Sequence, residues 1–182
     1  MVAKDLRKLG SGLVLTVHDI AVALAGTQRW NGATIVPWSV AQHVIAMHEI
    51  AHENNQHPFA LLTVLHHDDE EVVTGDIPLP FMVQEQIEYG DIIRSMIWKD
   101  TLGLTFEPTK WLDDVDQKMA AAEAQILCHP NVRALFDDPP ARYLDVVWEL
   151  LDMSRREQAH VFETLTEQLL NDPKVKALRG RV

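Results

Sequence analysis

Apolar residues recur along most of this chain at intervals of three and four positions, the spacing that places side chains on one face of a helix. The intervals predict helices over residues 12–25, 36–51, 81–103, 108–129 and 141–170, and a shorter apolar run lies at 61–65. The alternation of apolar and polar residues that strands require is absent outside short loops. The pattern therefore predicts an all-α protein, and a length of 182 residues suits one domain over residues 1–182.

Turn-forming and capping residues mark where these helices begin and end. Gly, Asn-Gly and Pro identify residues 26–39 as a loop, and Pro139-Pro140 starts the last long helix. Thr109 is the expected N-cap of the helix that follows it. Charged residues 155–157 interrupt the apolar face of the last helix, and we expect them to be solvated. About 10 residues at each end of the chain are expected to be peripheral to the domain.

The composition is that of an acidic globular protein. Hydrophobic residues make up 47% of the chain, and the formal net charge of −11 argues against a broad nucleic-acid-binding surface. The single cysteine, Cys128, excludes an intrachain disulfide and a multi-cysteine zinc site. No apolar run approaches the roughly 20 residues of a membrane span, and the N-terminus lacks the apolar core of a signal peptide. We therefore expect a cytoplasmic protein that binds neither nucleic acid nor a membrane.

A short polar run carries most of the candidate chemistry. Six consecutive positions, from His66 to Glu71, hold imidazoles or carboxylates and no Lys or Arg. On a helix, Glu71 would overhang both His67 and Asp68, which precede it by four and three positions. Imidazole and carboxylate together suit a divalent cation, and a Glu beside such a metal is well placed to handle a water. The alternative interpretation is an acidic helix end with two adjacent histidines, which requires no metal.

The extended pattern His67-Asp68-x-x-Glu71-x-x-x-Gly75-Asp76-Ile77-Pro78 resembles the central motif of HD-domain phosphohydrolases. It is most similar to the branch of 5′-deoxynucleotidases and bacteriophage deoxynucleotide hydrolases, which joins the His-Asp pair to a later Glu and a Gly-Asp turn. The resemblance implies a single HD-domain bundle of roughly six to seven helices. It also implies a homo-oligomer, dimeric or larger, in a bacterial cytoplasm or, for a phage-encoded protein, in the cytoplasm of the host.

The same resemblance assigns two further metal ligands. The family's first ligand lies in a Ser-Val-Ala-Glu-His pattern, which here ends at His43 with Gln42 in place of the Glu. Its last ligand is an Asp on a buried helix, matched by Asp116, and phage-like members carry a later Glu, matched by Glu123. Asp116 also lies on an apolar stripe, where a carboxylate is costly without a partner such as a metal. We interpret Glu123 as structural, or as a carboxylate that holds a ligand in place.

Substrate contacts follow from the resemblance in the same way. An Arg-Trp pair precedes the first ligand in that branch, and here it is Arg29-Trp30. Arg29 is expected to contact phosphate, and Trp30 to form part of the wall of the base pocket. Relatives often place a lysine shortly after the Gly-Asp turn, where this chain has Phe81-Met82. The candidates for a substitute cation are Arg94, Lys99 and Lys110.

These assignments imply metal-assisted hydrolysis of a deoxynucleotide. One divalent transition metal (Zn, Co, Mn or Fe), with Mg as an option at a second site, is expected to be held by His43, His67, Asp68 and Asp116. Glu71 is expected to move the proton of the water or of the leaving oxygen. Asp76 is expected to anchor the sugar or a second cation, and Arg29 to hold the phosphate charge.

Three functions are compatible with this site. The favoured one converts deoxynucleoside 5′-monophosphates to deoxynucleoside and phosphate. The second releases triphosphate from a deoxynucleoside triphosphate, dATP among them. The third is a non-catalytic regulatory protein that binds metal or nucleotide; the intact Glu71 argues against it, and the missing lysine favours it.

Four of the seven histidines outside the ligand set bear on this assignment. His18, in the first predicted helix, and His48 and His52, four positions apart in the second, are interpreted as surface residues. The spacing of His48 and His52 would also allow them to chelate a metal. On a helix, His66 points about 100° away from His67, so we leave it out of the metal site.

Overall fold

The chain folds into helices and the loops that join them. The structure, a computed structural model, describes residues 15–77 and 82–179, and over these residues it contains ten α-helices and no β-strand. Seven helices have eight or more residues: α1 (Val17–Leu24), α2 (Val40–Glu53), α3 (Pro58–Leu65), α5 (Gln84–Ile97), α6 (Lys110–Leu127), α8 (Ala141–Leu150) and α9 (Arg155–Asn171). Three are single turns: α4 (Glu71–Thr74), α7 (Pro130–Arg133) and α10 (Pro173–Lys176). The prediction of an all-α fold is confirmed.

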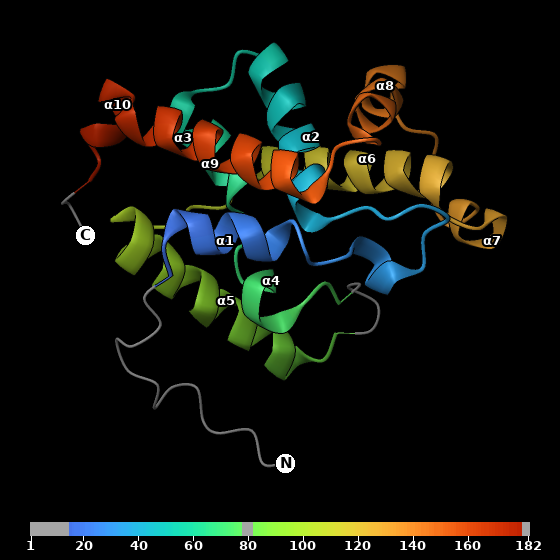
Figure 1. Cartoon of the computed structure of the whole chain (residues 1–182), viewed down its shortest axis with the longest axis horizontal. Helices are drawn as coiled ribbons and strands as arrows, with labels where there is room; N and C mark the ends of the chain where they lie inside the picture. Colours follow the sequence, from blue (N-terminus) through green and yellow to red (C-terminus); the bar gives the residue numbers. More distant parts are fainter. Residues whose placement is uncertain (1–14, 78–81, 180–182) are drawn as a thin grey trace.

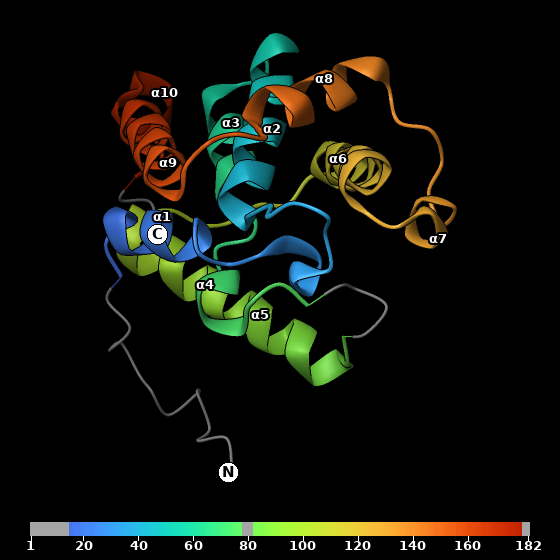
Figure 2. The same cartoon turned by 45° about the vertical axis from the view of Figure 1, so that its right-hand side comes forward.

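Helix α2 lies at the centre of the bundle. It packs against α3, α6, α8 and α9, and Figure 2 shows α9 and α6 on either side of it. In Figure 1, α8 lies beside the upper part of α2, whereas α1, α4 and α5 lie below. Every residue of α2 from Val40 to His48 is buried, because neighbouring helices surround it. The predicted core stripe, from Val40 to Ala51, is therefore confirmed, but burial extends to the other faces of the helix as well.

The single helix predicted over residues 141–170 is wrong, because the chain forms two helices there. Helix α8 ends at Leu150, and α9 begins after its N-cap, Ser154. The Ser154 hydroxyl accepts a hydrogen bond from the Glu157 N–H at 3.3 Å, and the Ser154 N–H donates to the Glu157 carboxylate at 2.8 Å. Such a capping box stabilises a new helix start over continuation of the old one. Residues 155–157 are exposed, as predicted.

Two other predicted helices keep their identity with shifted ends. Thr109 caps α6 as predicted, since its hydroxyl accepts a hydrogen bond from the Leu112 N–H at 3.2 Å. Helix α5 ends at Ile97 and continues into a π-helical turn that closes at Gly103, where φ is 68°. The predicted first residue of this helix, Phe81, lies outside the described residues. Among the helices of the described ranges, none combines the length and the apolar content that a membrane crossing needs.

His48 contradicts the prediction that it lies on the surface, whereas His18 and His52 are exposed as predicted. The His48 side chain is buried because α2 is covered on the face that carries it, and only 8% of the residue is exposed. Its ring stacks on that of His52, with the two planes 14° apart. Burial, reinforced by the nearby His52, lowers the pKa of His48 from 6.5 to about 4. The folded protein therefore holds this imidazole neutral at pH values where a free histidine is charged.

We expect the burial of His48 to make the fold less stable in mild acid. Between pH 6.5 and pH 4 the unfolded chain takes up a proton on His48 that the folded chain does not. The contribution of the neutral His48 to the free energy of unfolding is therefore complete above pH 6.5. It decreases by about 3 kcal/mol in total as the pH falls towards 4. Urea denaturation across this range should show a shallower pH dependence for His48→Gln than for the unmodified protein. The exposed His52→Gln is the control, and equal slopes for the unmodified protein and His48→Gln would contradict the prediction.

Candidate metal centre

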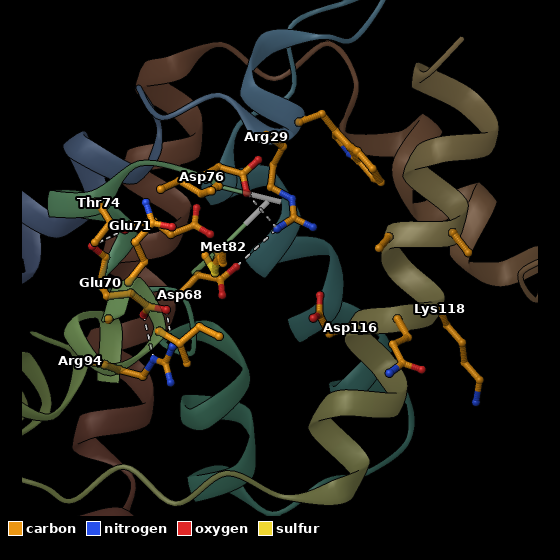
Figure 3. A pocket seen from close by; sticks show the side chains of 18 of the residues that line it. Arg29, Asp68, Glu70, Glu71, Thr74, Asp76, Met82, Arg94, Asp116 and Lys118 are labelled. Atoms are coloured by element: carbon orange, nitrogen blue, oxygen red, sulfur yellow. Dashed lines mark hydrogen bonds and ion pairs between the residues drawn. The ribbon is translucent and has the colours of Figure 1, made fainter. Parts of the chain in front are cut away.

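The proposed metal ligands come from three separate segments that meet inside the bundle. Helix α2, which starts at the N-cap Ser39, carries His43 on its first turn. Helix α3 ends at Leu65, so that His67 and Asp68 lie on the tight turn between α3 and α4. Helix α6 presents Asp116 from the opposite side of the cavity (Figure 3). His67 and Asp68 are thus placed together by their adjacency in sequence, whereas His43 and Asp116 reach this pair only through helix packing.

The ligand atoms of three of these residues lie within 4.8 Å of one another: those of His43, His67 and Asp68. His67 Nε2 is 3.2 Å from Asp68 Oδ1, and His43 Nε2 is 3.8 Å from Asp68 Oδ2. Asp116 Oδ1 is 3.1 Å from His43 Nε2 but lies outside the three-residue group. The structure therefore brings all four predicted ligands to one place, with Asp116 at its edge.

Unpartnered buried atoms test whether a cation fits this place. Four buried polar side-chain atoms lack a hydrogen-bond partner within the described residues: His43 Nε2, His67 Nε2, Asp68 Oδ2 and Glu71 Oε2. Buried polar atoms normally have partners, because burying them without one is unfavourable. Three of the four belong to the group described above. Two imidazole nitrogens and a carboxylate oxygen form a donor set that a borderline divalent transition metal accepts, so the residues fit such an ion.

The other ring nitrogen of each histidine is already engaged. His43 Nδ1 is 2.6 Å from Glu123 Oε1, and His67 Nδ1 is 2.7 Å from the backbone oxygen of Val64. A ring that donates its Nδ1 proton to an oxygen presents the lone pair of Nε2 on its opposite edge. Both histidines are therefore oriented as metal ligands usually are, with a carboxylate or a carbonyl behind the ring.

Electrostatics at His43 favour positive charge at this place. Burial by itself lowers the pKa of His43, but the carboxylates of Glu123 and Asp116 outweigh burial and raise it to about 10. Burial likewise opposes ionisation of Asp116, yet contact with His43 brings its pKa below its usual range. The carboxylates of Glu123, Asp116 and Asp68 near the imidazole thus outnumber the single cation Arg29. A divalent cation would supply the positive charge that these groups attract.

Glu71 faces the cavity beside the ligand group, at the start of α4. It is 7% exposed, and its Oε2 has no partner among the described residues. Burial raises the pKa of Glu71 well above its usual range, and the nearby Asp68 carboxylate raises it further. A carboxyl group whose pKa is raised holds a proton more readily and can both accept one and return it. Its position therefore suits the acid–base role that the sequence assigns to it.

Arg29 lies next to the ligands, on a loop with an unusual backbone. The two following residues adopt left-handed conformations, with φ of 58° at Trp30 and 50° at Asn31. Arg29 directs Nε and Nη2 at Glu123 Oε2, at 3.4 and 3.3 Å. Its Nη1 lies 3.7 Å from Asp68 and 3.9 Å from Asp76, too far for a hydrogen bond (Figure 3). Nη1 is therefore the part of the guanidinium that remains available to an anion.

Asp76 follows Gly75, whose φ of 70° allows the turn. The side chain of Asp76 is 7% exposed. Burial raises the pKa of Asp76, whereas Arg29 and the backbone N–H groups of Trp30 and Asn31 lower it. Asp76 therefore also supports the loop that carries Arg29, a role that the sequence does not indicate. The predicted Pro78, at the end of the same motif, lies outside the described residues.

Arg29, Asp68, Glu71, Asp76 and Asp116 line one cavity of about 1140 Å³. Trp30 forms part of its wall and packs edge-to-face on Phe136, with ring centroids 5.6 Å apart. Met82 also lines the cavity and brings no charge there. The cavity is large enough to hold a nucleotide, and its wall combines aromatic rings with carboxylates.

The candidates for a substitute cation have different surroundings. Arg94 lines the cavity but forms a two-point ion pair with the buried Glu70, so its charge is already balanced. Lys99 is exposed on the turn after α5, and the side chain of Lys110 lies outside the described part of the chain. Lys118, which the sequence analysis did not single out, lines the cavity and pairs with Asp114 at 2.5 Å. The one signal in the sequence for Lys118 as a cavity residue is its place on a solvent-facing turn of α6.

His66 belongs to a separate buried network. Its Nδ1 lies 2.9 Å from the Asp69 carboxylate, and its Nε2 lies 2.9 Å from the Thr166 hydroxyl on α9. The backbone oxygen of His66 accepts a hydrogen bond from the Trp98 indole at 3.1 Å. These contacts fasten the turn that carries His67 and Asp68 to the core. His66 thus points away from the metal ligands, which agrees with its exclusion from the site.

Neither a protein-family model nor a curated protein matches this chain. What the site can do chemically is therefore inferred from its own residues and their geometry.

Proposed function

We propose that this protein is a metal-dependent phosphohydrolase that removes phosphate from deoxynucleoside 5′-monophosphates. The observation that carries the proposal is the set of unpartnered buried atoms on His43, His67, Asp68 and Glu71, which line or adjoin one cavity next to Arg29. Donors for a cation, a carboxyl group for proton transfer and a guanidinium for an anion are thereby placed together. The resemblance of the HD motif to phosphohydrolases supports the same chemistry.

Each residue has a role that follows from its contacts. His43, His67 and Asp68, with Asp116 beside them, would hold a divalent cation, which supplies Lewis-acid polarisation of a phosphoryl oxygen and activation of a water. Glu71 accepts the proton of the attacking water or returns one to the leaving oxygen. The Nη1 of Arg29, which is near Asp68 and Asp76 but makes no hydrogen bond to them, binds a phosphate oxygen, while Nε and Nη2 stay fixed on Glu123.

The charges of the cavity favour a monophosphate. Among the described residues that line it, three are cationic (Arg29, Arg94 and Lys118), and nine are acidic: Asp68, Glu70, Glu71, Asp76, Asp91, Asp114, Asp116, Asp137 and Asp138. A triphosphate would bring several further negative charges into this acidic surrounding. The aromatic wall at Trp30 and Phe136 suits the flat ring of a nucleobase.

Release of triphosphate from a deoxynucleoside triphosphate is the second candidate. The cavity volume of about 1140 Å³ favours it, because that space exceeds what a monophosphate needs. In an acidic cavity, the longer phosphate chain requires a further cation, and Glu71 and Asp76 are the carboxylates proposed to bind it. Activity on triphosphates should therefore depend steeply on added Mg²⁺, Mn²⁺ or Co²⁺.

Product analysis with a panel of deoxynucleotides tests the proposal. Incubation of metal-loaded protein with deoxynucleoside monophosphates should yield deoxynucleoside and orthophosphate, with little need for cations beyond the tightly held one. Ion-exchange chromatography separates orthophosphate from intact triphosphate and so distinguishes the two reactions. If fully loaded protein hydrolyses neither class, the hydrolase proposal is wrong, and a regulatory protein that binds metal or nucleotide becomes the better explanation.

A further inference from the structure

Glu123 on α6 is fully buried and accepts hydrogen bonds from four side chains. Its Oε1 faces Trp38 Nε1 at 2.9 Å and His43 Nδ1 at 2.6 Å. Its Oε2 faces Trp30 Nε1 at 3.2 Å, and Arg29 Nη2 and Nε at 3.3 and 3.4 Å. A buried carboxylate is costly unless its oxygens are saturated with donors, and here both are. The position of Glu123 is therefore tightly determined by its neighbours.

The two oxygens of Glu123 serve two different parts of the site. Oε1 contacts the imidazole of His43, one of the residues proposed to hold the cation. Oε2 contacts the loop that carries Arg29, the residue proposed to bind phosphate. Because a carboxylate is planar and rigid, the orientation of the imidazole and that of the guanidinium cannot change independently of each other.

We propose that Glu123 is a positioning residue that couples the cation site at His43 to the anion-binding end of Arg29. The coupling rests on the metal centre proposed above and goes beyond it, because it assigns one carboxylate to both binding events. Towards the cation, Glu123 accepts the Nδ1 proton of His43, which fixes the ring and strengthens its Nε2 as a donor. Towards the anion, it occupies Nε and Nη2 of Arg29 and leaves Nη1 to meet a phosphate oxygen.

The backbone of the Arg29 loop supports this role. Trp30 and Asn31 both adopt left-handed conformations, which residues other than glycine rarely do. Such a backbone persists where its surroundings enforce it. The indole bond from Trp30 to Glu123, together with the contact of Trp30 on Phe136, provides that enforcement. Glu123 thus also keeps the loop in the conformation that directs Arg29 into the cavity.

The substitution Glu123→Gln tests the coupling. The glutamine amide keeps the shape of the carboxylate but carries no negative charge. Its NH₂ group replaces one of the two oxygens and cannot accept the hydrogen bonds that this oxygen accepts. We expect the affinity for Co²⁺, measured by competition with a chelator, to fall about 10–100-fold. The visible absorption bands of bound Co²⁺ should shift as well, because the geometry and the donor strength at His43 change. A purely structural carboxylate would lower thermal stability and leave both signals of the folded protein unchanged.

Inorganic phosphate reports on the other half of the coupling. At saturating Co²⁺, Glu123→Gln should weaken phosphate binding about tenfold, the size of one charge-assisted hydrogen bond. Arg29→Gln should weaken phosphate binding and change the affinity for Co²⁺ far less than Glu123→Gln does. In the double variant, phosphate binding should be no weaker than in Arg29→Gln alone, because Glu123 acts on phosphate through Arg29.

Trp38→Phe is the matched control, since it removes one donor from Oε1 but keeps His43 and Arg29 in place; it should lower stability only. If Glu123→Gln does not fold, Glu123→Asp is the second variant, because it keeps the buried charge but shortens the side chain by one methylene. It should weaken the binding of both Co²⁺ and phosphate. Unchanged Co²⁺ affinity and spectrum in folded Glu123→Gln would overturn the coupling, as would additive loss of phosphate binding in the double variant. Failure of the unmodified protein to bind Co²⁺ would instead remove the proposed metal centre, and the coupling with it.

Discussion

Replacement of Glu71 by glutamine is expected to lower the turnover of deoxynucleoside monophosphates about 100-fold or more, the range found when an acid–base group is removed. The glutamine amide keeps the size of the side chain but cannot take up the proton that the buried carboxylate, with its unpartnered Oε2, would accept in the proposed reaction. Because Glu71 lies outside the group of His43, His67 and Asp68, the metal content should stay close to that of the unmodified protein. Steady-state kinetics and elemental analysis of the same preparation measure both quantities.

The adjacent Glu70 provides a matched control for this substitution. Glu70 also lines the cavity, but both of its oxygens are held by Arg94. Glu70→Gln should therefore lower stability by weakening that ion pair and change turnover far less than Glu71→Gln does. Turnover that survives unchanged in Glu71→Gln would make this residue a structural charge and would refute the proposed mechanism.

Replacement of Asp68 by alanine is expected to release the metal. Asp68 is the only carboxylate within the group of three whose ligand atoms lie within 4.8 Å of one another. Its removal takes away the negative charge that offsets a divalent cation and leaves the two imidazoles, with Asp116 at the edge. The loss of metal affinity should exceed the roughly 10–100-fold loss that typically follows removal of a residue that hydrogen-bonds to a metal ligand. Elemental analysis of the purified variant, and competition with a chelator, measure the effect.

The neighbouring Asp69 distinguishes loss of a ligand from damage to the turn. Its carboxylate faces His66 and not the cavity, and the amide oxygen of Asp69→Asn can still accept the hydrogen bond from that ring. This variant should keep its metal, although it should unfold at a lower temperature. Full metal occupancy in Asp68→Ala would place the centre elsewhere in the molecule, and the His48–His52 pair would be the next candidate.

The helices of this protein are largely determined by local sequence. The apolar spacing of residues 108–129 and the hydroxyl of Thr109 specify α6 almost to its ends, because a helix and its cap depend on residues within one or two turns. The division between α8 and α9 is also local, since Ser154 and Glu157 form the capping box that starts α9. Helical periodicity does not indicate this division, because the apolar face continues across the break.

The candidate site is determined by sequence only in part. His67, Asp68 and Glu71 lie within one turn, so their spacing alone brings their side chains towards one another. His43 and Asp116 come from helices distant in sequence, and the sequence places them in the site only by resemblance to a known motif. The packing of α2 against α3 and α6 is what brings His43 to 3.8 Å from Asp68 and 3.1 Å from Asp116.

Burial and pairing were decided by the tertiary structure. The same polar pattern that suggests a surface position for His48 is compatible with a buried one, and only the helices around α2 exclude water from it. Arg94 is paired with Glu70, and Glu123 collects donors from Arg29, Trp30, Trp38 and His43, through contacts that span 24 to 94 positions of the chain. Helical periodicity is set by neighbours in sequence. The partners and the charge state of a buried side chain are set by neighbours in space, which this chain supplies only once it has folded.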